Sequence, residues 1–166
     1  STSFDTGLKY SGLKTESGQD YFDTNTGTRQ FEPELSDVLD YEEDIYAAYA
    51  SISKDWEKWS AKLGLRGEYT DVQGISESQG LVNSQDYLEL FPTFYLNFNA
   101  SEDHSFGFEY SRRITRPRFE NLNTYRYFLN ENNFQDGNPD LMPAIANTVK
   151  FSYGYKNKLF FDLYWD

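Results

Sequence analysis

The sequence lacks residues on which several classes of enzyme and metalloprotein depend. None of its 166 residues is cysteine, so disulfides, zinc–cysteine sites and cysteine nucleophiles are excluded. Its single histidine, His104, ends the segment 101–104, which we expect to be a solvated turn. A Ser-His-Asp triad would have to use that turn, and no Gly-x-Ser-x-Gly sequence is present. We therefore predict that the chain is not an enzyme, has no catalytic residue and holds no cofactor or metal.

Long hydrophobic runs are also missing, and so is an excess of positive charge. No stretch of about 18 apolar residues occurs, so we expect no transmembrane helix. Fifteen basic residues against 27 acidic ones give a formal net charge of −12. That sign argues against nucleic acid and against a polybasic membrane-surface module. The low mean hydropathy does not exclude a transmembrane barrel, because barrel strands expose only every second residue to lipid.

Aromatic residues, by contrast, make up 19% of the chain, and they favour β-strands. The clearest strand is residues 59–70, in which apolar and polar side chains alternate strictly. About eleven residues at roughly 3.3 Å each, tilted by about 40°, rise about 27 Å. That height is close to the apolar band of an outer-membrane barrel. Further strands are expected at 4–11, 88–99, 105–115, 148–155 and 159–165, and one without assigned faces at 41–53.

The connections between these seven strands alternate between short and long. Short links are expected at 54–58, 101–104 and 156–158, and long loops at 14–40, 71–86 and 116–143. Tight turns at one end and long loops at the other are typical of an outer-membrane barrel, whereas a Greek-key sandwich does not sort its loops this way. We therefore predict an all-β fold: an antiparallel up-and-down meander of about seven strands, forming part of a larger transmembrane β-barrel.

Tyrosine and tryptophan residues gather at the ends of the expected strands. Such side chains suit a membrane–water boundary because one end of each is apolar and the other polar. We assign Tyr10, Tyr69, Tyr87 and Tyr110 to the long-loop end, and Trp56, Trp59, Tyr153 and Tyr155 to the short-turn end.

We expect the chain to be a piece of a larger barrel. It begins at Ser1 without an initiator methionine, and seven strands are fewer than the minimum of about eight, always an even number, in a bacterial barrel. Open sheet edges are not tolerated in lipid, so the remaining strands would come from further sequence or from another chain. Residues 1–166 are therefore interpreted as one partial outer-membrane barrel domain, without the remaining strands.

Two sets of side chains are candidates for contact with a solute. Charged residues on the polar phase of the strands are expected to face the lumen, either as a structural network or as a guide for solute: Lys62, Arg66, Glu68, Glu109, Arg113 and Lys150. The loop 116–143 is rich in aromatic, Asn and Arg residues, which stack on and hydrogen-bond to sugars or peptides, although such loops also pack on themselves. Its candidate ligand contacts are Arg118, Tyr125, Arg126, Tyr127, Asn133 and Asp136.

Two acidic segments have both a structural and a functional interpretation. The acidic run between Glu32 and Asp44 is expected to be a solvated loop far from the membrane. Calcium binding is the alternative, although the spacing and the central glycine of an EF-hand loop are missing. The segment Asp136–Asp140 is expected to form a turn, with ion or ligand contact as the alternative.

Several motifs in the second half of the chain resemble one family. Ser111–Pro117, Leu122–Asn123 and Gly137–Pro143, with Ile45–Ala50, Gly64–Thr70 and Leu90–Thr93 upstream, resemble the barrel of TonB-dependent receptor-like outer-membrane proteins common in Bacteroidetes. The resemblance covers roughly residues 39 to 166. The chain departs from the family pattern at Thr124, which is usually proline, and at Met142–Ala144, which is usually a Lys-Pro-Glu-like run.

The resemblance implies a plugged barrel of about 22 strands in the bacterial outer membrane, with a plug that we expect to lie outside residues 1–166. It also implies outer-membrane lipid as the surroundings and a TonB-type energy-coupling protein as a partner, contacted through segments outside this sequence. The predicted function is uptake of a solute, which could be a sugar, a peptide or a siderophore. The alternatives are a soluble β-sandwich that binds carbohydrate and an outer-membrane barrel enzyme. One face discriminates barrel from sandwich, because it meets lipid in the first and a closed core in the second: Leu63, Leu65, Phe94, Leu96, Phe106 and Phe108.

Overall fold

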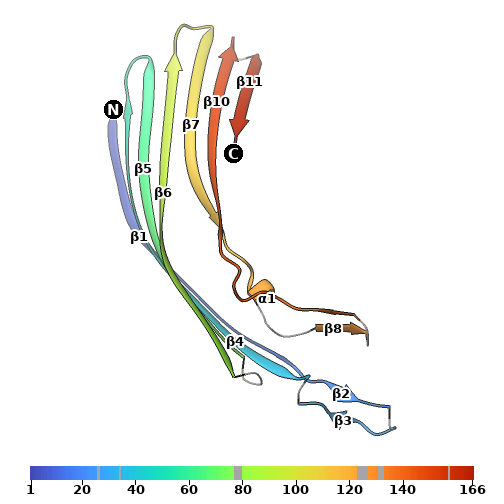
Figure 1. Ribbon diagram of the computed structural model, residues 1–166. Coiled ribbons are helices and arrows are strands. Elements are labelled where there is room, and N and C mark those ends of the chain that lie inside the picture. The colour runs from blue at the N-terminus through green and yellow to red at the C-terminus, as the bar shows by residue number, and fades with distance from the viewer. Residues whose placement is uncertain (26, 34, 77–79, 123–126, 131–132, 157) are drawn as a thin grey trace.

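The computed structural model describes residues 1–25, 27–33, 35–76, 80–122, 127–130, 133–156 and 158–166. Within that part of the chain, the principal element is a curved seven-stranded sheet with the order β1-β4-β5-β6-β7-β10-β11 (Figure 1). All neighbouring strands are antiparallel, so the predicted up-and-down meander is confirmed. The strands are Thr2–Gln19 (β1), Asp37–Asp55 (β4), Trp59–Ser76 (β5), Leu81–Asn99 (β6), His104–Thr115 (β7), Ala144–Tyr155 (β10) and Leu159–Trp165 (β11).

Short elements lie in two of the connections. β2 (Phe22–Asp23) pairs with β3 (Gln30–Phe31) between β1 and β4, while α1 (Phe119–Leu122) and the pair β8 (Tyr127–Asn130) and β9 (Asn133–Gln135) lie between β7 and β10. We call the end of the sheet with these elements the loop end, and the opposite end, at the top of Figure 1, the turn end. No helix in the described ranges has the length and apolarity needed to span a membrane.

The register sorts the side chains onto two faces. Residues opposite one another in neighbouring strands lie on the same face, so alternation in one strand fixes the faces of the whole sheet. The apolar face carries one residue from each strand in the row Phe4–Ile52–Leu63–Phe94–Tyr110–Val149–Trp165. The polar face carries the row Ser3–Ser53–Lys62–Tyr95–Glu109–Lys150–Tyr164. The predicted facing of β1, β5, β6, β7 and β10 is therefore confirmed.

The apolar face is uncovered. Leu8 is 86% exposed, and Leu63 and Leu65 in the middle of β5 are 55% and 51% exposed. No second sheet packs on this face in the part of the chain that the structure describes, so the face does not form the closed core that a sandwich requires. The buried hydrophobic residues lie instead on the polar face: Leu39, Tyr41, Ala47 and Phe91. An apolar face of this size needs lipid or another apolar partner.

Five of the six connections have the predicted length class, short or long. The turn-end links are short, and the long connections after β1 and β7 span residues 20–36 and 116–143. The predicted long loop 71–86 is wrong, because β5 continues to Ser76 and β6 begins at Leu81. Asp71 and Asp86 suggest a loop in the sequence, yet they pair with each other across the two strands. β-Branched residues on both sides, such as Val72 and Val82, favour the extended backbone and lengthen this hairpin.

Aromatic side chains form a row near each end of the apolar face. At the loop end Tyr10, Tyr46 and Tyr69 lie in one register row. At the turn end the row is Trp59–Phe98–Phe106–Tyr153–Phe161, and the rings of Trp59 and Phe98 stack at 4.0 Å. The ten-residue separation of Trp59 and Tyr69 corresponds to about 25 Å in a strand tilted by about 40°. The two rows are therefore spaced like the girdles of an outer-membrane barrel.

Two tyrosines do not belong to these rows. Tyr87 pairs with Thr70 on the polar face, one position out of phase with Leu88. Tyr110 lies on the apolar face, level with Leu63 in mid-sheet rather than with Tyr69. The assignment of Tyr110 to the loop-end boundary is therefore wrong, whereas Tyr87 has the predicted height but lies on the polar face. Tyr110 is only the seventh residue of β7, counted from the turn end, whereas Tyr69 is the eleventh residue of β5, so Tyr110 lies closer to the turn end.

The ladder between β6 and β7 is short. It covers Thr93–Asn99 of β6 and ends beside Pro92, which has no N–H to donate. Beyond this point β7 turns away from β6 (Figure 1). Arg112 Nη1 donates to the Leu90 carbonyl at 2.6 Å, and its Nη2 lies 2.7 Å from Glu89 Oε2. The guanidinium thus satisfies a backbone acceptor that the departing strand leaves open.

Candidate functional site

All six charged residues predicted to face a lumen lie on the polar face. Lys62, Glu109 and Lys150 share one row, but Lys150 pairs with Asp162 of β11 at 3.3 Å. Arg66 and Glu68 form an ion pair along β5. Within the described residues, Lys62, Glu109 and Arg113 have no ion-pair partner. Only some of the six residues are therefore joined in ion pairs, and the side chains of the other three project from the polar face without such a partner among the described residues.

Arg116 joins the loop after β7 to the polar face. Its Nη2 donates to Glu68 Oε2 at 2.6 Å and to Thr70 Oγ1 at 3.0 Å, and its Nε donates to Tyr87 Oη at 3.2 Å. Glu68 and Thr70 are buried, with 7% and 0% of their surface exposed. Two arginines on one buried carboxylate offset the cost of removing it from water. This role of Arg116 could not be predicted from the sequence, because the two β5 partners are 48 and 46 residues away along the chain.

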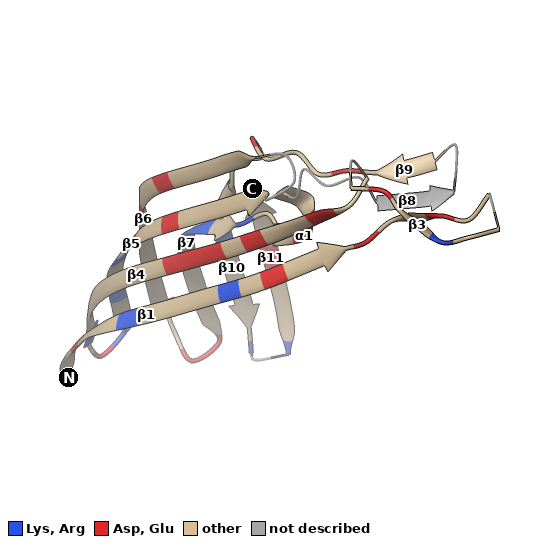
Figure 2. Ribbon diagram, turned by 90° about the horizontal axis from the view of Figure 1, so that it is seen from below, with Lys and Arg blue, Asp and Glu red and all other residues tan. Residues whose placement is uncertain are grey.

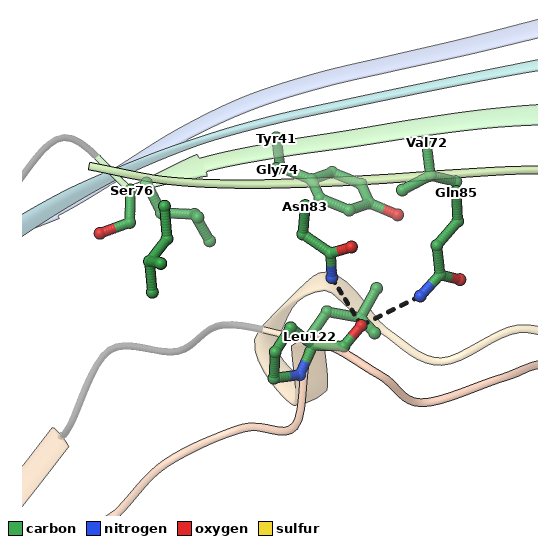
Figure 3. Close-up of a pocket in the computed structure, with 10 residues that line it drawn as sticks. Tyr41, Val72, Gly74, Ser76, Asn83, Gln85 and Leu122 are labelled. Carbon is green, nitrogen blue, oxygen red and sulfur yellow. Dashed lines mark hydrogen bonds between the residues drawn. The ribbon is translucent and has the colours of Figure 1, made fainter. Parts of the chain in front are cut away.

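Two described parts of the loop 116–143, Phe119–Leu122 and Asn138–Leu141, lie over the polar face of β4, β5 and β6. In Figure 3 the side chains of Asn83 and Gln85 point to one carbonyl oxygen, that of Pro139, and donate to it at 2.6 Å and 3.0 Å. The ring of Phe119 in α1 lies 6.1 Å from the ring of Tyr41. A space of about 40 Å³ remains between the loop and the sheet. The loop is thus held by a few specific contacts over an incompletely filled interface.

The two legs of this loop are also tied to each other. The Asn138 N–H donates to the Asn121 carbonyl at 2.7 Å. The Leu141 N–H donates to the Asn138 carbonyl at 3.2 Å, and the Asn138 side chain accepts from the Asp140 N–H at 3.0 Å. This is a turn with proline at its second position, as predicted from Asp136–Asp140. The turn presents the Pro139 carbonyl toward β6.

Tyr41 lies beneath α1 and is 4% exposed. Its hydroxyl donates to Glu43 Oε2 at 3.2 Å. Burial and the Glu43 carboxylate raise the pKa of Tyr41, so the phenol stays neutral and keeps its donor. The polar face at the loop end therefore offers an uncharged aromatic platform beside the two amides.

The candidate ligand contacts of the loop are only partly placed. Arg118 precedes α1, Asn133 begins β9 and Asp136 follows β9. Asp136 lines a cleft of about 360 Å³ together with Phe119, Glu120 and Gln135, opposite Gln19 at the end of β1. Arg118 and Asn133 do not line that cleft. Tyr125 and Arg126 lie outside the described residues, and Tyr127 is described only as the first residue of β8.

Negative charge concentrates at the loop end, as Figure 2 shows along β4. In the sequence, residues 11–45, 70–87 and 116–143 contain 17 acidic and 5 basic residues, which equals the whole formal net charge of −12. The prediction that the acidic run is a loop is wrong for its second half, because Asp37–Asp44 belongs to β4. Glu34 lies outside the described residues. Among the described residues, the acidic run included, no group of acidic or histidine side chains is arranged so that it could hold a metal ion.

His104 is the first residue of β7 rather than a turn residue. Its Nδ1 lies 2.7 Å from Tyr153 Oη, and its ring lies 5.1 Å from the ring of Tyr155. The histidine therefore belongs to the aromatic boundary at the turn end, where an N–H or a lone pair faces a phenol.

The whole chain, residues 1–166, matches the model of a family described as the outer membrane protein beta-barrel family. Searches among curated proteins and among solved structures gave no match. The family match agrees with the uncovered apolar face and with aromatic rows at the spacing of a bilayer.

Proposed function

The chain belongs to the outer membrane protein beta-barrel family of the bacterial outer membrane, and from this premise we propose that it forms part of the wall of a solute-uptake receptor. The observation that carries the proposal is the division of one sheet into two faces. The apolar face holds exposed Leu63 and Leu65 between the aromatic rows, while the polar face holds charges such as Lys62 and Arg113. A wall of this kind separates lipid from a polar passage.

In this proposal the loop end faces the exterior and captures the solute. Outer-membrane barrels place their short turns on the periplasmic side and their longer loops outside. The loop 116–143 supports the assignment, because it combines aromatic, amide and charged groups with an anchored position over the polar face. The solute would be a sugar, a peptide or a siderophore. The wall itself performs no chemistry on it.

We further propose that uptake is coupled to a TonB-type partner, through segments outside this sequence. This part rests on the resemblance of Ser111–Pro117 and Gly137–Pro143 to TonB-dependent receptor-like barrels. Removing the energy-coupling protein from the native host should abolish uptake through the whole barrel. Uptake that persists without energy coupling would instead indicate a passive pore.

The loop provides the main test of the uptake proposal. Replacing Arg118–Asp136 in the full-length protein by a short Gly/Ser linker should leave assembly intact, because the seven-stranded sheet lies outside that segment. Growth of a deletion strain carrying this variant should be compared on peptides, glycans and ferric siderophores as single nutrient sources. On the nutrient that the intact protein supports, uptake should fall by about tenfold or more, as expected for loss of a loop that carries binding.

A matched control uses the opposite end of the sheet. Exchanging the turn Ser101–Asp103 for another short turn should change neither assembly nor uptake, since short turns offer little surface for a ligand. Normal uptake in the loop variant combined with loss in the turn variant would show that the orientation is inverted.

A further inference from the structure

Two amide side chains at the loop end of β6 converge on one acceptor. Asn83 and Gln85 are two positions apart, so both project from the polar face. Each donates to the Pro139 carbonyl, at 2.6 Å and 3.0 Å, and both are partly buried beneath the loop (Figure 3). A peptide carbonyl has two lone pairs and can accept both bonds. The pair is therefore a clamp for a carbonyl oxygen.

The surface around the clamp is apolar and neutral. Among the described residues that line the space, none carries a charge: Leu39, Tyr41, Val72, Gly74, Ser76, Leu81, Asn83, Gln85, Leu122 and Pro139. Leu39 and Tyr41 are 7% and 4% exposed, so the platform is well shielded from water. A Cβ atom added at Gly74 would meet no atom within 4 Å other than those of its chain neighbours. The surface thus combines a clamp for a carbonyl oxygen with an apolar space that the loop does not fill completely.

The present occupant indicates which ligand this surface suits. It is a prolyl peptide, with its carbonyl in the clamp and Leu122 from the other leg beside it. A short neutral peptide offers the same pair of features, an amide carbonyl next to an apolar side chain. A sugar offers hydroxyl groups and no such carbonyl, and an anionic ligand would find no cation in the lining.

We infer that the Asn83–Gln85 clamp and the Tyr41 platform form a subsite for a short peptide solute, which the loop fills with its own Pro139 peptide until the solute displaces it. This inference rests on the proposed uptake function, since it names the solute class for the same end of the barrel. Phe119 and Arg116 act as positioning residues, because they hold the loop over the subsite without belonging to the clamp.

The inference predicts opposite effects from two kinds of substitution. The loop competes with the solute, so the apparent affinity equals the intrinsic affinity multiplied by the fraction of molecules in which the subsite is open. Loosening the loop with Phe119→Ala should therefore tighten peptide binding by several-fold. Removing the clamp with Asn83→Leu and Gln85→Leu together should weaken binding by about tenfold or more, even though it also frees the loop.

The probe is a synthetic acetylated and amidated pentapeptide, Gly-Asn-Pro-Asn-Leu, which is the sequence of residues 137–141 with Asp140 replaced by asparagine so that the peptide is neutral. Its binding to the full-length protein in detergent is measured by isothermal titration calorimetry, with maltotetraose as the sugar arm. Ser84→Leu is the matched control, since Ser84 lies between the two amides but on the exposed apolar face. This control should leave the affinity unchanged.

Three outcomes would overturn the subsite. They are absence of peptide binding to both the wild type and the Phe119→Ala variant, binding that the double leucine variant leaves unchanged, and binding of maltotetraose with the same dependence on Asn83 and Gln85. Failure of the uptake function is distinguished by the growth assay described above. Nutrient uptake without clamp-dependent peptide binding would reject only the subsite, whereas peptide binding without any nutrient uptake would reject the uptake function.

Discussion

Replacing Leu65 by arginine tests directly which face of the sheet meets lipid. Leu65 is 51% exposed on the apolar face, four residues from Tyr69 and six from Trp59. At about 3.3 Å per residue and a tilt of about 40°, it lies roughly 10 Å from the tyrosine row and roughly 15 Å from the tryptophan row. Arginine on a barrel's lipid face costs about 2–4 kcal/mol at the midplane and about 0–1 kcal/mol at the boundary. For Leu65→Arg we therefore expect a loss of about 2–3 kcal/mol.

Two neighbouring substitutions serve as controls. Tyr69→Arg places the same charge at the boundary row and should cost at most about 1 kcal/mol. Arg66→Leu removes a polar-face charge, but Glu68 keeps its hydrogen bond from Arg116, so the loss should stay near 1 kcal/mol.

The measurement is reversible folding of the full-length protein into phospholipid vesicles at increasing urea, followed by tryptophan fluorescence and heat-modified gel mobility. Equal losses for Leu65→Arg and Arg66→Leu, or a larger loss for the latter, would refute the assignment of the faces and with it the membrane location of this strand.

Three further expectations follow from the described contacts. The chain of residues 1–166 alone, in buffer without detergent, should not be a monodisperse monomer by size-exclusion chromatography with light scattering, because β1 and β11 leave long sheet edges beside an apolar face. Arg112→Leu should destabilise the full-length barrel by about 2–3 kcal/mol in the same urea titration, since the Leu90 carbonyl and Glu89 lose their partner; Arg113→Leu, whose side chain has no ion-pair partner among the described residues, should cost less. Trp59→Ala should cost about 1 kcal/mol by loss of the stack on Phe98, since Trp59 is 43% exposed and is not a core residue; a midpoint unchanged in urea would contradict this.

The sheet could be predicted from the sequence because its period is two. Strict alternation at residues 59–70 fixes the faces of β5, and pairing then carries those faces to every other strand. The end of β5 could not be predicted in the same way. Val72, Gly74 and Ile75 break the alternation between apolar and polar residues, and Asp71 looks like the start of a loop. Cross-strand pairing with β6 overrides this local composition.

The candidate site was less accessible to prediction than the sheet. Charges on the polar phase, such as Lys62 and Arg113, follow from the same alternation as the strands. The inward fold of the loop 116–143 does not, because it depends on contacts between Arg116 and Glu68 and between Pro139 and Asn83. Such pairs leave no periodic pattern in a single sequence. Only the turn at Asn138–Leu141 could be predicted locally, because Asn, Pro and Asp favour a turn by themselves.

The short ladder between β6 and β7 divides the wall into two panels of unequal height. Strands β1, β4, β5 and β6 pair along nearly their whole lengths, whereas β6 and β7 pair only from Thr93 opposite Ser111 to Asn99 opposite Ser105. Each panel can form by pairing of its own neighbouring strands, while the seam between the panels, the pairing of β6 with β7, adds few backbone hydrogen bonds when it forms. We therefore expect this seam to form late in assembly and to separate first under mechanical load. Among the described residues, Arg112 makes the only hydrogen bond from a side chain to the backbone across it.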